Sequence, residues 1–174
     1  MRIVGRLAIV ATLLFGCVGC DQVSKEYARS QYVLGESHSY LGDTFRIIHV
    51  ENPGAFLGIG ASLPESTRTI VFQGAISILI LALLWAAAFR VGTPRWHMVG
   101  FTLLAASGIG NLIDRLLNDG RVTDFLNVGI GAFRTGIFNI ADVVGVAGLL
   151  VFILANRESM HRTNACSESA DRPP

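Results

Sequence analysis

Charged residues are scarce in this sequence. Asp, Glu, Lys and Arg make up only 16% of its 174 residues, whereas 51% are hydrophobic. A soluble domain usually has about 25% charged residues, so the shortage excludes an ordinary soluble protein and indicates that much of the chain lies in lipid. No run of basic residues interleaves with aromatic ones and the formal net charge is +1, so we expect no nucleic-acid partner.

Cysteine is also rare, with three in the chain. Cys17 and Cys20 lie inside an apolar stretch and Cys166 lies in a polar tail, which is neither a disulfide framework nor a zinc-binding pattern. The sequence gives no sign of a nucleophilic cysteine paired with a histidine either. The compartment must therefore be inferred from the membrane topology.

Long uncharged stretches are the main feature that is present. Residues 69–89 carry no charge, residues 96–113 carry none, and residues 135–156 carry only Asp142. A membrane-spanning helix needs about 20 apolar residues, so each stretch is long enough or nearly so. The first uncharged stretch, residues 7–20, reaches that length if its helix continues to Ser24.

We therefore predict a membrane α-helical protein with four transmembrane helices, at residues 7–24, 69–89, 96–114 and 136–156. The first stretch also has the length of the apolar region of a signal peptide, and the residues ending at Cys17 and at Cys20 resemble lipoprotein cleavage sites. Three later spans favour an uncleaved first helix, so residues 1–157 form a single membrane domain.

Two segments lie outside the predicted spans. Residues 26–66, between helices 1 and 2, include a β-branched and aromatic run at residues 44–50, which predicts a small extracytoplasmic β-sheet. Residues 158–174 are polar and predict a disordered cytoplasmic tail. Basic residues in the short loops place both termini in the cytoplasm, so residues 26–66 and the loop at residues 115–134 face outward.

Several ionisable residues lie within or at the ends of the predicted spans. Asp142 lies inside the last helix, Asp114 and Arg115 close the third, and Asp21 and Lys25 close the first. A charge at the centre of a membrane helix costs at least ~2.5 kcal/mol, so such residues usually mark function. In the predicted topology all five lie at the outward end of the bundle, which suggests a site there.

The local spacing supports a site built on two carboxylates. Asn139 and Asp142 are spaced to share one helix face. Asn111, Asp114 and Arg115 likewise share one face of the third helix. The loop at residues 115–134 could return to the bilayer surface and bring Asp124 over Asp142. Two close carboxylates share a proton, so one can take a proton from water while the other donates one to a peptide carbonyl.

Five short blocks resemble those of the lipoprotein signal peptidases (signal peptidase II). In order they are Asp-Gln-Val-Ser-Lys at residues 21–25, Glu-Asn-Pro-Gly-Ala-Phe at 51–56, Gly-Asn-Leu-Ile-Asp-Arg at 110–115, Val-Thr-Asp-Phe at 122–125 and Phe-Asn-Ile-Ala-Asp at 138–142. Each block alone is weak, but the last three together are specific. Their order and their placement on the helices agree over residues 7–156.

The resemblance implies an aspartic endopeptidase of the bacterial cytoplasmic (inner) membrane. The family removes the signal peptide of prolipoproteins by cutting before a cysteine that carries diacylglycerol. Its catalytic pair corresponds to Asp124 and Asp142 here, and Arg115 and Asn52 are assigned to holding the lipid-modified substrate. The full supporting set comprises Asn111, Arg115, Asn139, Asp114, Asn52, Gly54, Asp21 and Lys25.

The resemblance also sets expectations for ligands and partners. No metal and no cofactor are implied. The expected partners are prolipoproteins with a diacylglyceryl cysteine and membrane phospholipid, and we expect a monomer. Two departures from the family pattern stand out: Phe56 comes one residue early, and a usual pair of glycines is replaced by Ala106-Ser107.

Other interpretations remain open on the sequence alone. A small transporter or channel subunit could use Asp142 and Asp114 as a proton relay, although residues 69–89 and 143–155 offer almost no polar path through the inner half. An inactive relative could bind lipoprotein precursors without cutting them. His49 and His97 show no partner pattern and are taken as ordinary residues.

Individual residues also have structural alternatives. Asp114 and Arg115 could be an ion pair at a helix end, the two site asparagines could be interhelical hydrogen-bonding residues, and residues 52–54 form a good turn in their own right. Asp21 and Lys25 are as readily structural as functional.

We predict that a chain shortened after Arg157 keeps its cleavage activity, because the family resemblance covers only residues 7–156. Cleavage of a diacylglyceryl-modified precursor by the shortened and the full-length chains in the same lipid would be compared. Loss of activity on shortening would show that the tail takes part in the reaction or in folding.

Overall fold

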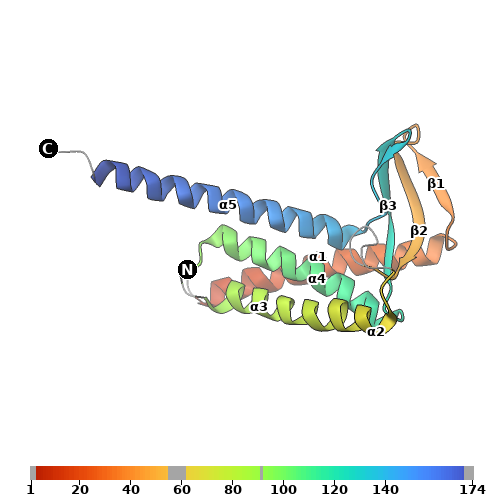
Figure 1. Ribbon diagram of the computed structural model, residues 1–174, viewed down its shortest axis with the longest axis horizontal. Helices are drawn as coiled ribbons and strands as arrows, with labels where there is room; N and C mark the ends of the chain where they lie inside the picture. Colours follow the sequence, from red (N-terminus) through yellow and green to blue (C-terminus); the bar gives the residue numbers. More distant parts are fainter. Residues whose placement is uncertain (1–2, 55–61, 91, 171–174) are drawn as a thin grey trace.

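A computed structural model of the chain describes residues 3–54, 62–90 and 92–170. Within these residues, four helices are long and apolar enough to cross a membrane: Ile3–Gln31, Thr69–Phe89, Arg95–Leu117 and Ile140–Arg157. Figure 1 shows them running side by side, with the sheet at one end of the bundle. The predicted class, a four-helix membrane protein with a small sheet, is confirmed.

The second span is assembled from two consecutive helical segments, η2 (Thr69–Ala75, a π-helix) and α3 (Ile76–Phe89), and the short helix α2 (Glu65–Arg68) precedes it. The remaining spans are single helices, α1 (Ile3–Gln31), α4 (Arg95–Leu117) and α5 (Ile140–Ala170). α4 lies in the centre of the bundle and contacts α1, α3 and α5.

Several helix boundaries differ from the predicted ones, most clearly those of α1 and α5. α1 continues to Gln31, beyond residue 24, because its last turns bury Lys25 and Ala28 against the rest of the protein. α5 begins at Ile140 rather than at residue 136. It then continues to Ala170, although the polar composition after residue 157 predicts disorder; a helix already formed by a span is extended more easily than it is started.

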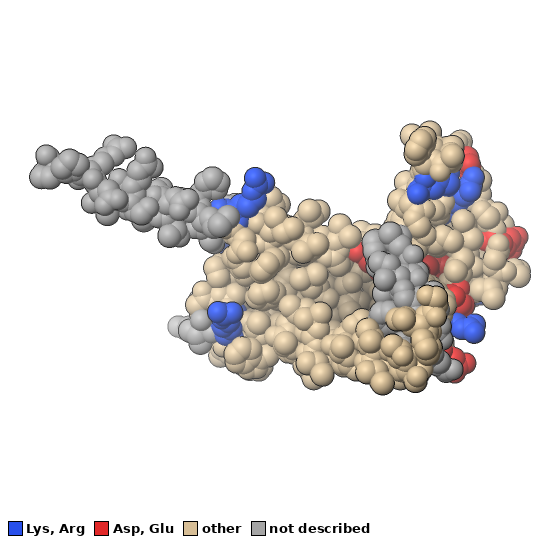
Figure 2. All heavy atoms as spheres, viewed as in Figure 1, with Lys and Arg blue, Asp and Glu red and all other residues tan. Residues whose placement is uncertain are grey.

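Most large apolar side chains point away from the bundle. Phe15 and Ile78 are exposed, and the small buried apolar cluster consists of Val10, Ala87 and Met98. Figure 2 shows charged side chains near the two ends of the molecule, with an uncharged surface over the helices between them. This distribution is that of a protein whose helices are surrounded by lipid.

Small residues let α4 and α5 approach closely. A Cβ atom on Gly148 would lie 2.9 Å from the main-chain nitrogen of Leu104 and 3.1 Å from the carbonyl oxygen of Gly100. At Gly108 and Gly110, where the sequence also suggests room for a neighbour, a Cβ would instead meet side chains. Backbone contact through glycine is a common way for membrane helices to pack.

The sheet has four antiparallel strands in the order β1 (Ser37–Tyr40), β2 (Phe45–Asn52), β3 (Val122–Ile130) and β4 (Phe133–Arg134). The first two come from the segment where a sheet is predicted. The other two come from the segment predicted to be a loop, so that prediction was wrong. β-branched and aromatic residues favour a strand at β3. Its pairing with β2 covers an edge of β2 that would otherwise be open.

The pairing of β2 with β3 contains an irregularity. Ile47 pairs with Leu126 but Val50 pairs with Asp124, so β2 has one more residue than β3 over this stretch. Such a β-bulge turns side chains in a new direction and is often found beside functional sites. His49 lies in the bulge, and Asp124 lies directly beside it.

We predict that Gly148→Ala destabilises the bundle by about 1–3 kcal/mol, because the added methyl group would overlap the backbone of α4. Gly16→Ala is the matched control, since a Cβ there meets nothing within 4 Å. Thermal unfolding in detergent would measure both. Equal midpoints for the two variants would contradict the close approach of α4 and α5.

Candidate active site

Asn139 joins the two aspartates of the predicted pair. Asp124 lies on β3 and Asp142 in the first turn of α5. The Nδ2 of Asn139 donates to Oδ1 of Asp124 at 2.6 Å. Asn139 and Asp142 also bond reciprocally, since each main-chain N–H donates to the other's side-chain oxygen, at 3.1 and 3.0 Å. This capping arrangement starts α5 and fixes the Asp142 carboxylate.

The second oxygen of Asp124 is held by Asn52. Nδ2 of Asn52 donates to Oδ2 of Asp124 at 2.8 Å. The Oδ1 of the same amide accepts from the main-chain N–H of Gly54 at 2.8 Å, which turns its NH2 group toward the carboxyl. The end of β2 therefore fixes the orientation of Asp124 from the side opposite to Asn139.

Asn111 does the same for Asp142. Its Nδ2 donates to Oδ1 of Asp142 at 3.1 Å, while its Oδ1 accepts from Nζ of Lys25 at 2.9 Å and from Nδ2 of Asn139 at 3.0 Å. Because an ammonium group can only donate, Lys25 determines which end of the amide faces it. The amide thus presents its donor to the carboxyl of Asp142.

The environment of Asp124 favours its neutral form. Burial raises the pKa of this carboxyl to about 7, and the negative charge of Asp142 adds to the rise, against the opposing hydrogen bonds from Asn52 and Asn139. Only 3% of Asp124 is exposed. Near neutral pH this carboxyl therefore holds a proton in a large share of the molecules.

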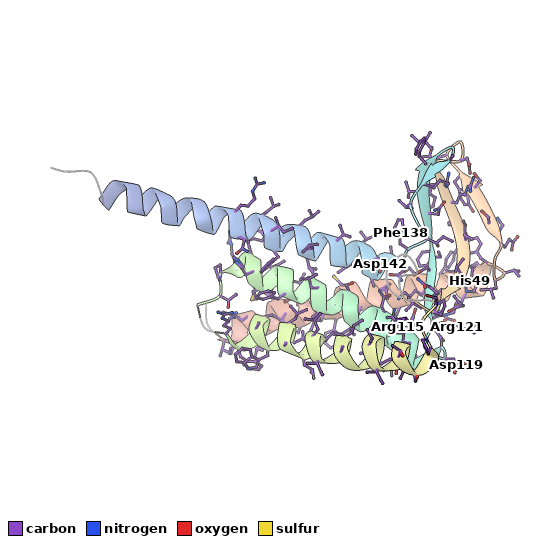
Figure 3. The ribbon with its side chains drawn as sticks, viewed as in Figure 1. His49, Arg115, Asp119, Arg121, Phe138 and Asp142 are labelled. Atoms are coloured by element: carbon purple, nitrogen blue, oxygen red, sulfur yellow. The ribbon has the colours of Figure 1, made fainter. Side chains whose placement is uncertain are left out.

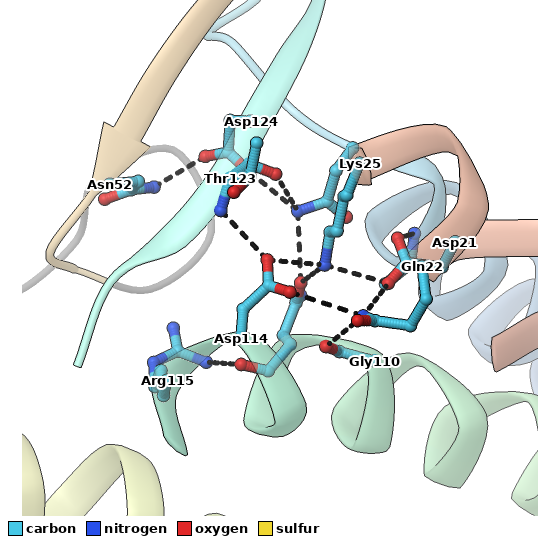
Figure 4. A network of polar contacts seen from close by, with 12 residues as sticks. Asp21, Gln22, Lys25, Asn52, Gly110, Asp114, Arg115, Thr123 and Asp124 are labelled. Atoms are coloured by element: carbon cyan, nitrogen blue, oxygen red, sulfur yellow. Dashed lines mark hydrogen bonds and ion pairs between the residues drawn. The ribbon is translucent and has the colours of Figure 1, made fainter. Parts of the chain in front are cut away.

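Lys25 is completely buried, and all three of its ammonium hydrogens have an acceptor. Nζ lies 2.8 Å from Oδ2 of Asp21, 3.1 Å from Oδ2 of Asp114 and 2.9 Å from Oδ1 of Asn111 (Figure 4). Both aspartates are themselves only 1% exposed. The charge of the lysine is therefore compensated within the protein and ties α1 to α4.

The two aspartates beside Lys25 each bind a second element. Oδ1 of Asp21 accepts from the main-chain N–H of Ala141 at 2.8 Å, so a negative charge lies at the positive end of α5. Oδ2 of Asp114 accepts from the main-chain N–H of Thr123 at 3.0 Å, directly before Asp124 in the chain. These contacts attach α5 and β3 to the same buried charge cluster.

Arg115 connects α4 to the chain just after β2. Its Nη2 donates to the carbonyl oxygen of Gly54 at 2.7 Å, and its Nη1 donates to that of Asn111 at 3.1 Å. Figure 3 shows Arg115 and Asp142 at the end of the bundle nearest the sheet. Phe56, whose early position departs from the family pattern, lies outside the described residues.

The structure thus brings all ten predicted site residues into one connected cluster. It also adds residues that the sequence reasoning missed. Gln22 donates to the carbonyl oxygen of Gly110 at 3.0 Å, and Thr123 connects Arg29 with Glu51 through its hydroxyl group. Gln22, Glu51 and Thr123 lie inside the short blocks, so the blocks themselves could have indicated them.

The described residues contain no group of three or more His, Cys, Asp or Glu side chains arranged to hold a metal ion. The polar atoms that converge here are carboxylates, amides and cationic side chains. Such a set can bind a water molecule and a peptide carbonyl and can move protons between them.

Comparisons with known proteins identify the family of this chain. The family model for signal peptidase (SPase) II matches residues 13–156. A lipoprotein signal peptidase of Desulforapulum autotrophicum is 32% identical over 87% of this chain and 91% of its own length. The corresponding protein of Borrelia duttonii is 35% identical over 88% of this chain and 89% of its own length.

A solved structure has the same fold. It is a bacterial membrane enzyme determined by the in meso method at 2.3 Å resolution, and it is 28% identical with a TM-score of 0.74. The match covers 88% of this chain and 90% of the other. Family, relatives and fold agree over the same part of the sequence, and the chain is a membrane peptidase that belongs to the signal peptidase II family.

Proposed function

We propose that this protein is an aspartic endopeptidase that removes the signal peptide from diacylglyceryl-modified prolipoproteins, cutting before the lipidated cysteine. Asp124 and Asp142 are its catalytic pair. The observation that carries this proposal is Asn139, whose side-chain amide donates to the Asp124 carboxyl and whose main-chain N–H donates to the Asp142 carboxyl. Burial at the same time raises the pKa of Asp124 to about 7. The relatives are themselves lipoprotein signal peptidases.

The two carboxyls take different roles. Both oxygens of each aspartate accept a bond from an N–H donor, so these bonds do not distinguish the two roles. Because burial raises the pKa of Asp124, we assign Asp142 as the ionised carboxylate that removes a proton from water. Asp124, protonated near neutral pH, donates its proton to the oxygen of the scissile carbonyl. The water oxygen bonds to the carbonyl carbon and gives a tetrahedral diol. A proton from Asp142 then passes to the leaving nitrogen as the C–N bond breaks, and one diol hydroxyl returns its proton to Asp124 as the new carbonyl forms.

The surrounding residues position the substrate and the pair. Arg115 donates to the carbonyl oxygen of Gly54, and the side-chain oxygen of Asn52 accepts from the main-chain N–H of Gly54. We assign both residues to holding the lipid-modified substrate. We place the protein in the inner membrane of a bacterium as a monomer in contact with phospholipid. Both termini then face the cytoplasm and the site faces outward.

The carrier alternative has little support within the described residues. Arg6 is the buried charged side chain at the far end of the bundle, and its guanidinium donates to the carbonyl oxygen of Ala87 at 2.8 Å. Thr102 is buried between the two ends, and its hydroxyl returns to the carbonyl oxygen of Met98 in its own helix. Neither residue extends the polar cluster into a path for ions.

We expect Asp124→Asn and Asp142→Asn each to lower cleavage at least about 100-fold, because each removes a proton donor or acceptor. The assay is a gel shift of a diacylglyceryl-modified precursor with purified protein in lipid. Asp119→Asn is the matched control, since this exposed aspartate lies just beyond α4 (Figure 3). If only Asp142→Asn fails to cleave, Asp114 becomes the candidate partner and the assignment of Asp124 is wrong.

The rate should also depend on pH in a defined direction. Because the pKa of Asp124 is about 7, the proton-donating form is lost above that pH, and kcat/KM should fall about 10-fold per pH unit. Asn52 donates to the charged form and so lowers this pKa. Asn52→Ala should therefore move the alkaline fall to higher pH, whereas Asn127→Ala, elsewhere on β3, should leave it in place. A shift to lower pH would contradict the assignment.

A further inference from the structure

His49 faces a hydrogen-bond acceptor on each side of its ring. Nδ1 lies 2.9 Å from the main-chain oxygen of Tyr32, and Nε2 lies 3.1 Å from Oε1 of Glu51. The residue is only 8% exposed. A neutral imidazole has one N–H and can satisfy only one of these acceptors, whereas an imidazolium donates to both.

The Glu51 oxygen that meets His49 also accepts a second bond. The hydroxyl of Thr123 donates to Oε1 of Glu51 at 2.9 Å and in turn accepts from Nη1 of Arg29 at 2.7 Å. An oxygen that receives two hydrogen bonds at once suits an ionised carboxylate, which can only accept. The geometry therefore fits a charged His49 beside a charged Glu51.

Thr123 connects this pair to the proposed catalytic residues. It pairs with Glu51 across the sheet and directly precedes Asp124. Its main-chain N–H donates to Asp114, and its carbonyl oxygen accepts from Nδ2 of Asn139 at 3.4 Å. A displacement of the Thr123 side chain would thus be passed to the strand that carries Asp124.

The bulge in β2 explains why a histidine can reach this position. The extra residue between Ile47 and Val50 turns His49 toward the end of α1, where Tyr32 follows the last helical residue. The carbonyl oxygen of His49 accepts from the main-chain N–H of Gly35 at 2.8 Å, which holds the bulge in place. The ring therefore links α1 to β2 beside the strand pair that contains Asp124.

Other charged groups surround the pair. Arg29 comes from α1, Asp114 from α4 and Asp124 from β3, while His38 on β1 pairs with Glu36 at 3.1 Å and packs against the ring of Tyr32. Arg29 is itself paired with the exposed Glu26 at 3.3 Å and with Asp114 at 3.9 Å.

We propose that His49, as an imidazolium, is a positioning residue of this peptidase. It fixes Glu51, which through the Thr123 hydroxyl holds β3 so that Asp124 stays in line with Asp142. The proposal rests on the proposed function of the two aspartates. It gives roles to His49 and Glu51, whose hydrogen bonds go to Tyr32, to each other and to Thr123.

The test combines kinetics with a matched histidine. His49→Gln replaces two ring nitrogens with one amide nitrogen, so the Tyr32 carbonyl and Glu51 can no longer both accept a bond. We therefore expect kcat to fall about 10- to 100-fold with KM unchanged. His38→Gln is the control, because His38 faces a glutamate at the same 3.1 Å but is exposed. A higher KM with normal kcat, or an equal effect of His38→Gln, would overturn the proposal.

A double-variant comparison tests the route through Thr123. Thr123→Val removes the hydroxyl and keeps the shape, so it should lower kcat similarly. Combining it with His49→Gln should then cost no more than the larger single effect, because both remove the same connection. Multiplied effects would show that His49 does not act through Thr123. If His49→Gln fails to fold, Glu51→Gln, which removes the same charge contact, takes its place in this comparison.

The protonation of His49 can be observed without any catalysis. In the wild-type protein labelled with ¹⁵N-histidine and held in lipid, His49 should show two protonated ring nitrogens near neutral pH. The signal is assigned by its loss in His49→Gln among the four histidines. A neutral ring would overturn this inference alone. Failure of the wild type to cleave, with a doubly protonated His49, would count against the proposed function instead.

Discussion

The buried ammonium group of Lys25 is the constraint on which the rest of this structure depends. A charge with no exposure is stable only if it is paired and fully hydrogen-bonded, and removing one partner from such a pair typically costs about 3–5 kcal/mol. Its partners lie on α1 itself and on α4. The carboxylates that neutralise it then bind the start of α5 and the start of β3. Four elements therefore meet at one point because one cation must be compensated.

Asparagine amides extend this order to the two proposed catalytic carboxyls. Each of Asn52, Asn111 and Asn139 has one end held by the protein, by Gly54, Lys25 or Asp142, so that its NH2 group is directed at an aspartate. An amide can orient a carboxyl without adding a charge, and so it leaves the sharing of a proton between two aspartates intact. The ion pairs of Lys25 hold the helices together, and the neutral asparagine amides orient the two aspartates.

Local patterns in the sequence predicted the helices and most of the cluster. Uncharged stretches marked the spans, and acidic or amide residues at helix spacing placed Asn111, Asn139 and Asp142 correctly at one end. The strand that carries Asp124 could not be predicted in the same way, because it pairs with residues 70 to 83 positions earlier, and such pairing leaves no local period. His49 gave no signal because its partners include a main-chain oxygen, which any residue supplies.

The division of the sheet between two distant parts of the chain has a consequence for biogenesis. β2 is synthesised before the second span, whereas β3 follows α4 and the capping residues of α5 come later still. The ribosome must therefore have released nearly the whole polypeptide before the two aspartates can meet. A nascent or partly inserted chain therefore lacks one member of the proposed catalytic pair until α5 has been made.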